Sequence, residues 1–173
     1  MKKIIFSIVC LLIGLGSLNA QESGDKLKAL LDKQEYVFVA TSVFPQGDAA
    51  TQRILNRLSQ GGGNQLTQLS AGYDVKVSKT TVESFLPYFG RAFSAPMNPN
   101  EGGIKFKSED FEYSRKQKKK KGWDIVIKPK DVSDINYLNL SVSESGYANL
   151  LVVSNQKSQI SFYGYITAPE NKK

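Results

Sequence analysis

The sequence predicts a mainly β protein: an antiparallel meander of about eight strands that forms a curled sheet or a small lipocalin-like barrel, with a short N-terminal helix. Apolar and polar residues alternate in many short segments, as in strands with one buried face. Short turns separate these segments, which favours antiparallel pairing. A sheet of this size usually curls or closes on itself. The alternative is an α+β fold, in which the helix covers one face of an open antiparallel sheet.

Residues 1–20 have the features of a secretory signal peptide. Two lysines precede an apolar run from Ile4 to Leu15, and Ala20 supplies a small residue for cleavage. We therefore expect an exported protein of the periplasm or cell envelope, with one β-rich domain over residues 21–173. Cleavage would lower the net charge from +7 to +5, since Lys2 and Lys3 would be removed. We find no other segment that could span a membrane.

The first elements of the domain are predicted to be a helix and a central strand. The segment from Ser23 to Gln34 carries leucines at helical spacing, which form one apolar stripe: Leu27, Leu30 and Leu31. The segment from Tyr36 to Phe44 is apolar on both faces, as expected for a central strand. Its aromatic residues are predicted to share one face: Tyr36, Phe38 and Phe44.

Residues 45–72 predict a long flexible excursion, with a short helix between Asp48 and Ser59. A strand from Tyr73 to Val77 follows. The pair Thr80 and Glu83 then fits a capping box, which predicts one helical turn. The side chains expected to face the core from that turn are Val82, Phe85 and Leu86.

The remaining strands follow each other closely. Two short ones are expected over residues 104–107 and 111–115, and a four-stranded meander extends from Trp123 to Ile166. Leu150 to Val153 is apolar on both faces and predicts another central strand. Gly164 lies on the apolar face of the last strand, where a glycine often marks a bulge, a bend or a close approach by another group.

The composition excludes several kinds of chemistry. The chain has no histidine, and its one cysteine, Cys10, lies in the predicted signal peptide. Ser-His-Asp and Cys-His catalysis are therefore excluded, as are zinc sites built from these residues. We expect no cofactor and no metal. A carboxylate-based hydrolase such as a glycosidase remains open, because acidic residues are scattered over strands and turns. They include Asp74, Asp110, Glu112, Asp124 and Asp134.

Aromatic residues in two places are candidates for binding. Tyr88, Phe89 and Arg91 lie on one turn and would suit the mouth of a pocket for a small apolar ligand. Alternatively, Phe89 fills the core and Arg91 pairs with a carboxylate. Tyr163 and Tyr165 share the face of the last strand opposite its apolar residues, and Tyr137 and Tyr147 also lie in the meander. They would stack on a glycan or meet an envelope protein, or they are ordinary half-buried strand residues.

The run of basic residues before Trp123 is a third candidate. Lys118, Lys119, Lys120 and Lys121 are expected at a hairpin tip, where they either remain solvated or contact an anionic surface. Nucleic acid is not an expected partner, because no recognition module is present.

Several sequence blocks resemble a known family. In order, YDVKV, LPYFGRAF, GGIKF, GWDI, SESGYANLLV and ISFYGYI are similar to the ungapped blocks of the family called domain of unknown function 4251, which consists of exported proteins from Bacteroidetes. The resemblance implies an envelope location and no particular activity. Together with the residues, it favours a non-catalytic binding or accessory protein, and the carboxylate-based hydrolase is the alternative.

Overall fold

The computed structural model describes residues 24–45, 68–90, 92–93, 103–119 and 122–170. Within them one helix covers residues 24–33, and nine strands form a single sheet. The strands are β1 (Tyr36–Pro45), β2 (Asp74–Val77), β3 (Val82–Leu86), β4 (Ile104–Ser108), β5 (Phe111–Gln117), β6 (Trp123–Pro129), β7 (Ile135–Val142), β8 (Tyr147–Ser154) and β9 (Ile160–Thr167). The predicted signal peptide and most of the predicted excursion, residues 46–67, lie outside the described residues.

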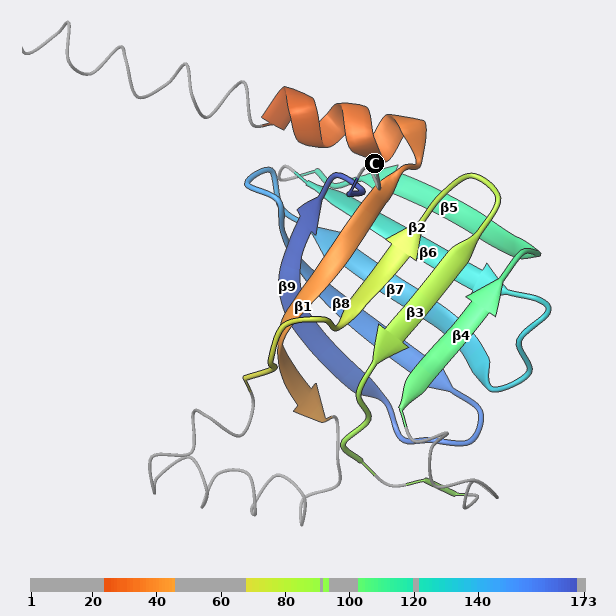
Figure 1. The fold of residues 1–173 in the computed structure, drawn as a ribbon. Coiled ribbons are helices and arrows are strands. Elements are labelled where there is room, and N and C mark those ends of the chain that lie inside the picture. The colour runs from red at the N-terminus through yellow and green to blue at the C-terminus, as the bar shows by residue number, and fades with distance from the viewer. Residues whose placement is uncertain (1–23, 46–67, 91, 94–102, 120–121, 171–173) are drawn as a thin grey trace, which may run out of the picture.

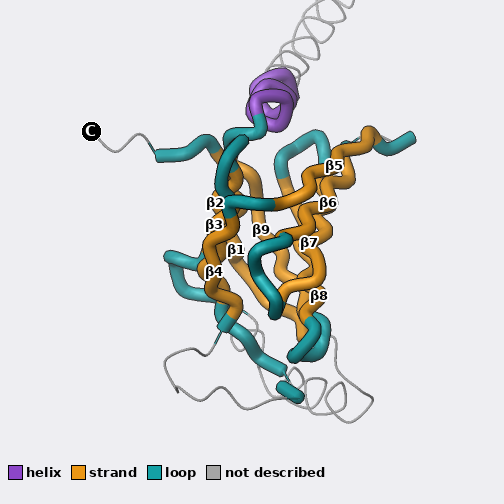
Figure 2. Tube along the Cα trace, turned by 90° about the vertical axis from the view of Figure 1, so that its right-hand side faces the viewer, coloured by secondary structure: helices purple, strands orange, loops and turns teal. Residues whose placement is uncertain are grey.

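The sheet curls until its two edges meet at one corner. Its strand order is β4-β3-β2-β1-β9-β8-β7-β6-β5, and neighbours are antiparallel. The edge strands β4 and β5 are joined directly through Glu109 and Asp110. Strands β2 to β4 lie in one layer and β6 to β8 in the other (Figures 1 and 2). The result is a nearly closed barrel, which confirms the predicted fold class. The helix lies over one end of the barrel and not on a face of an open sheet.

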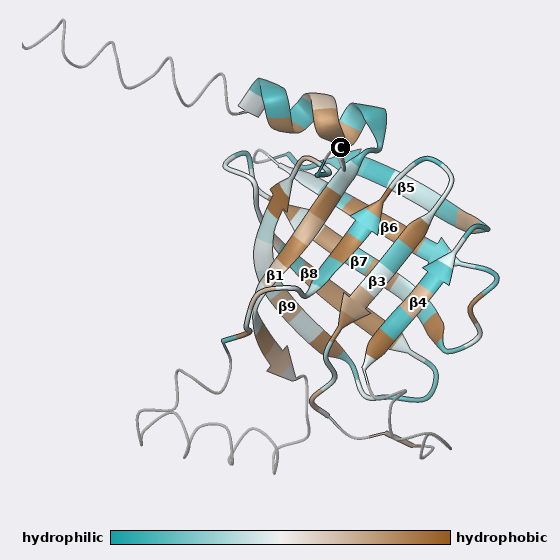
Figure 3. Ribbon diagram, in the orientation of Figure 1, coloured by the Kyte–Doolittle hydropathy of each residue, from teal (hydrophilic) through white to brown (hydrophobic). Residues whose placement is uncertain are grey.

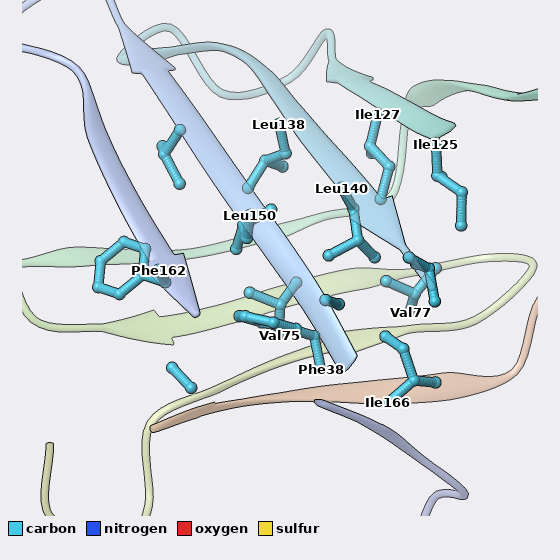
Figure 4. Close-up of a cluster of buried hydrophobic side chains, with 14 of the residues drawn as sticks. Phe38, Val75, Val77, Ile125, Ile127, Leu138, Leu140, Leu150, Phe162 and Ile166 are labelled. Carbon is cyan, nitrogen blue, oxygen red and sulfur yellow. The ribbon is translucent and has the colours of Figure 1, made fainter. Parts of the chain in front are cut away.

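The interior of the barrel is filled with apolar side chains. Hydrophobic and hydrophilic residues alternate along strands such as β3 and β4 (Figure 3), so each strand turns one apolar face inward. In Figure 4, Leu150 of β8 and Ile127 of β6 face the interior together with Val75 of β2, and Phe38 and Phe162 come from the paired strands β1 and β9. All of these belong to one buried cluster. In a barrel of this size, close-packed side chains are enough to fill the interior.

The helix closes one end of the barrel. Leu27 and Leu31 are buried, and Leu30 packs against the core, so the predicted leucine stripe is confirmed. Asp32 forms an ion pair and a hydrogen bond with Arg115 of β5. This contact joins the helix to an edge strand.

The segment after β3 crosses the opposite end of the barrel (Figure 1). The Tyr88 hydroxyl donates to the carbonyl of Ser158 at 3.1 Å and also lies 2.8 Å from its hydroxyl. Ala92 forms a β-bridge with Lys157, and the Phe93 amide donates to the carbonyl of Gln156 at 2.7 Å. The turn between β8 and β9 thus holds this segment in place.

The helical turn predicted near residue 82 is wrong, because this segment forms β3. Val82 and Leu86 are buried, whereas Phe85 points outward and stacks on Tyr73 with ring centroids 5.8 Å apart. The expected cap instead forms a hairpin turn, in which Ser78 accepts a hydrogen bond from the Thr81 amide at 2.9 Å. Pairing with β2 and β4 on both sides outweighs a local helix signal.

The predicted position of Phe44 is also wrong. The pairing of β1 with β9 shifts register between Ala40 and Ser42. This bulge turns Val43 inward and leaves Phe44 44% exposed on the outside. Gly164, paired with Ala40, faces the bulge, and a side chain there would collide with the carbonyl group of Val39. The expectation that Gly164 marks a bulge or a close approach is confirmed.

Asp131 holds the corner at which the two edges of the sheet meet. One of its carboxylate oxygens accepts a hydrogen bond from the hydroxyl of Ser108 at 2.5 Å. The other accepts hydrogen bonds from the backbone amides of Glu109 and Asp110 at 2.8 and 3.2 Å. The Lys130 amide donates to the carbonyl of Asp110 at 2.8 Å. These bonds fix the short connection from β4 to β5.

Replacement of Asp131 by asparagine should reduce stability at neutral pH but have little effect in acid. The hydrogen bond from Ser108, followed by those from the Glu109 and Asp110 amides, lowers the pKa of the Asp131 carboxyl below 3.8. A lowered pKa contributes stability above the unfolded-state value, and this contribution is lost as the pH falls through the folded-state value. The urea midpoints of the wild type and Asp131→Asn should therefore differ at pH 7 and begin to converge only as the pH falls below about 4, toward the lowered pKa of Asp131. A constant difference across this range would contradict the prediction.

Candidate functional site

Aromatic side chains gather on the outside of the barrel where β1, β9 and β8 lie side by side. Tyr147, Tyr163 and Tyr165 are 71%, 46% and 42% exposed, although their strand neighbours Phe162 and Ile166 are buried. We call Phe44, Tyr147, Tyr163 and Tyr165 the aromatic face. A folded protein rarely exposes large apolar groups side by side without a functional reason.

The rings of the aromatic face are held in place by their neighbours. Tyr147 of β8 lies directly opposite Tyr165 of β9, where cross-strand side chains interact. Phe44 meets Tyr163 edge-on, with centroids 5.0 Å apart and ring planes at 83°. The hydroxyl of Thr41, within the β1 bulge, donates to the carbonyl of Tyr163 at 3.1 Å. The bulge thus both places Phe44 on this face and anchors the strand that carries Tyr163.

A hollow of about 380 Å³ adjoins the aromatic face. Two of its lining residues are Tyr147 and Tyr163, and the others are Thr41, Lys118, Ser141, Val142, Ser143, Ala148, Asn149 and Gly164. Hydroxyl and amide groups therefore lie beside two aromatic rings. This combination of apolar surface with a few polar groups is typical of ligand sites, and the volume is within their usual range.

Lys118 is the charged member of this lining. Its Nζ lies 3.0 Å from Oδ1 of Asp124 and donates a hydrogen bond to the hydroxyl of Ser141. From the sequence, the lysine run and the tyrosines are separate candidates. The structure brings Lys118 and Tyr163 into the lining of one hollow, because the β5–β6 hairpin lies against the end of β7, where the turn to β8 begins.

A second, larger groove lies on the other side of Tyr165. Its volume is about 760 Å³, and its lining includes Val37 and Val39 of β1 and residues 167–170. Asp74 and Glu83 also line it, and Lys76 lies 3.7 Å from the carboxylate of Asp74. Three carboxylates, those of Asp74, Glu83 and Glu170, therefore share one groove, and the hydrolase alternative requires two.

The remaining residues singled out from the sequence lie elsewhere. Tyr88 is half-buried and bonded to Ser158, Phe89 is half-exposed, and Arg91 lies outside the described residues. Because apolar side chains fill the barrel, this turn covers packed core. Lys119 is exposed near the hairpin tip, whereas Lys120 and Lys121 lie outside the described ranges. Tyr137 is only partly exposed.

The ionisable groups with displaced pKa values are structural. Burial raises the pKa of Tyr36, whose hydroxyl lies 3.5 Å from that of Tyr113 under the helix. Partial burial would raise the pKa of Asp134, but hydrogen bonds from Lys157 and Ser154 outweigh it and the pKa is lowered. Asp134 is therefore held as an anion, whereas a catalytic general acid needs a raised pKa. Among the described residues, no group of three or more acidic side chains is placed to hold a metal ion.

The fold and this surface define a class of protein: a small antiparallel β-barrel with a packed interior and an aromatic outer face. The chain belongs to the family DUF4251, a domain of unknown function, whose family model matches residues 19–166. No curated protein matches the sequence. In the described part of the chain, no helix is long and apolar enough to cross a membrane.

A solved structure shares the fold. It is the crystal structure of a DUF4251 family protein from Bacteroides eggerthii DSM 20697 at 1.95 Å resolution, with a TM-score of 0.55 and 15% sequence identity. The match covers 84% of this chain and 87% of that chain. At this identity the likeness establishes the architecture and leaves the site to be argued from the residues themselves.

Proposed function

We propose that the protein is a non-catalytic binding module of the cell envelope that holds a glycan on its aromatic face. The observation that carries this proposal is the set of four exposed aromatic side chains beside a hollow with hydroxyl and amide groups. A sugar has an apolar ring face and a rim of hydroxyls, so it matches both parts of this surface. Aromatic residues present such contact area at a low cost in side-chain entropy.

The packed interior argues against a small apolar ligand inside the barrel. Large side chains of the paired strands β1 and β9, Phe38 and Phe162, are fully buried in the space that such a ligand would need. A protein partner would also use exposed aromatic residues. A glycan is favoured because the hollow places separate polar groups beside the rings, which suits a ligand with many hydroxyls.

Export supports the same proposal. The apolar run from Ile4 to Leu15 and the small residue Ala20 indicate secretion, which would expose the protein to envelope polysaccharides. Amino-terminal sequencing of the protein from the periplasmic or outer fraction should begin at Gln21. An uncleaved protein in the cytoplasm would contradict the proposed location.

Replacement of Tyr163 by alanine should weaken glycan binding by at least about tenfold, since it removes a stacking platform worth more than about 1.4 kcal/mol. Tyr163→Phe keeps the ring and should retain most of the affinity. Binding is measured by titration calorimetry with the best member of an oligosaccharide panel. The control is Phe85→Ala, which removes a ring of the same 46% exposure from β3, away from the aromatic face. A wild type that binds no glycan, or equal losses in the two alanine variants, would overturn the proposal.

The second candidate is a hydrolase that uses Asp74 and Glu83. These carboxylates line the groove beside Tyr165, which would then hold the sugar chain. Release of reducing ends from the bound glycan, abolished by both Asp74→Asn and Glu83→Gln, would favour this function. Binding without turnover would favour the non-catalytic module.

A further inference from the structure

We propose that the glycan held in the hollow is acidic, with its carboxylate bound by the ammonium of Lys118. This inference rests on the proposed function and specifies the class of ligand. In this arrangement a uronic acid ring lies against Tyr147 and Tyr163, and its carboxylate points toward β5 and β7. Ser141, Ser143 and Asn149 line the same hollow, where the sugar hydroxyls would lie.

Lys118 is positioned for this role before any ligand arrives. Its amide donates to the carbonyl of Gly122 at 3.0 Å, which closes the β5–β6 hairpin. Gly122 has a φ of +105°, and a side chain there would collide with the carbonyl oxygen of Val142. The hairpin therefore packs against the end of β7. Asp124 and Ser141 hold the ammonium of Lys118, so little side-chain entropy is lost on binding.

The ammonium retains capacity for a further acceptor. It has three N–H groups, and the contacts with Asp124 and Ser141 account for two of them. The side chain is 34% exposed, so an incoming carboxylate can reach it. A charge-assisted hydrogen bond is about twice as strong as a neutral one, which makes the carboxylate the preferred acceptor.

The charge around the hollow matches an acidic ligand. Lys118 alone carries a charge among the described residues that line it. Lys116 and Lys119 are exposed on the same hairpin, and Asp124 offsets one of these three cations. The domain that remains after removal of the predicted signal peptide, with Lys2 and Lys3, is basic and carries a formal net charge of +5. A polyanion is therefore attracted to this end of the aromatic face over about one Debye length, roughly 10 Å at 0.1 M salt.

The test compares an oligomer of galacturonic acid with the same oligomer in which each carboxyl is methyl-esterified, which replaces the negative charge by a neutral ester with one added methyl group. The wild type should bind the acid form at least about tenfold more tightly, as expected for one charge-assisted contact. Lys118→Met should abolish this preference while retaining the affinity for the ester. Lys128→Met is the matched control, because Lys128 is exposed on β6 and does not line the hollow. It should keep the preference.

A second variant should increase the preference for the acid form, so a folding defect in Lys118→Met cannot produce both results. Asp124→Asn removes the carboxylate that competes for the ammonium, so the preference for the acid form should increase by about threefold or more. Higher salt should reduce the preference in the wild type and leave the binding of the ester unchanged.

The outcomes separate this inference from the proposed function. If the wild type binds the acid and the ester equally, or if Lys118→Met and Lys128→Met lose the same affinity for the acid, the acidic ligand is wrong. Loss of ester binding in Tyr163→Ala would still support the aromatic face as a glycan site. If neither oligomer binds but vesicles of phosphatidylglycerol bind in a Lys118-dependent manner, both proposals fail and the hairpin is a membrane contact.

Discussion

Replacement of Gly164 by alanine is expected to lower the free energy of unfolding by about 3 kcal/mol or more. The added methyl would strike the carbonyl oxygen of Val39 and lie only 2.9 Å from its carbonyl carbon and 3.1 Å from the Cα of Ala40. All three atoms belong to the backbone of β1, which is hydrogen-bonded between β2 and β9. The strand has no flexible side chain end that could move aside, so the sheet itself must shift.

Thermal unfolding measures this effect, with the single tryptophan, Trp123, as a buried fluorescent probe. For a domain of this size, the expected loss lowers the melting temperature by about 6–12 °C. Gly24→Ala is the control: a methyl group there meets nothing within 4 Å, and at the first residue of the helix the substitution should change stability by less than about 0.5 kcal/mol. A Gly164→Ala protein as stable as the wild type would show that β1 does not lie against Gly164.

Gly164→Ala should also affect binding. The bulge opposite Gly164 turns Phe44 outward and positions Thr41, which bonds to the carbonyl of Tyr163. A shift of β1 would therefore loosen the support of the aromatic face as well as the core. We expect weaker glycan binding in the folded fraction of this variant.

Two phenylalanines on adjacent strands should respond very differently to replacement by alanine. Phe162 of β9 is fully buried and pairs with Val43, so Phe162→Ala leaves a cavity and should cost about 3–5 kcal/mol. Phe44 lies one residue further along β1 but is 44% exposed, and Phe44→Ala should cost less than about 1 kcal/mol. The difference comes from burial, since the residue type and the substitution are the same.

Urea unfolding gives the two free energies, and the same samples give the effect on ligand binding. Phe44→Ala should weaken glycan binding, because it removes the edge-to-face contact that holds the Tyr163 ring in position. Similar stability losses for the two variants would mean that Phe44 lies inside the barrel, as its alternation with Phe38 predicts without a bulge.

Much of the architecture follows from local pattern. Alternation in the meander from β6 to β9 predicts which residues are buried, and the structure confirms it for Leu138, Leu140 and Val142. Strands that are apolar on both faces, β1 and β8, are central in the sheet. The alternation predicts burial well in these strands, because a one-residue shift in register would turn all the apolar side chains of a strand toward water.

The misassigned segments are those in which a distant partner decides the conformation. The Thr80 to Glu83 pattern is a valid helix start by itself, but β2 and β4 offer backbone partners on both sides of β3. Phe44 is displaced by a bulge that lies against Gly164, more than a hundred residues further along the chain. Neither competing partner is visible within a local window of sequence.

The sequence by itself determined the class of fold, the filled apolar faces and the absence of histidine and cysteine chemistry from the domain. It also identified Tyr163, Tyr165 and the lysine run as separate candidates. Only the tertiary structure placed Lys118 in the same hollow as Tyr163 and brought Phe44 to the aromatic face. The physical reason is that strand patterns fix which side of a sheet a residue occupies, whereas curling and register fix which residues on that side become neighbours.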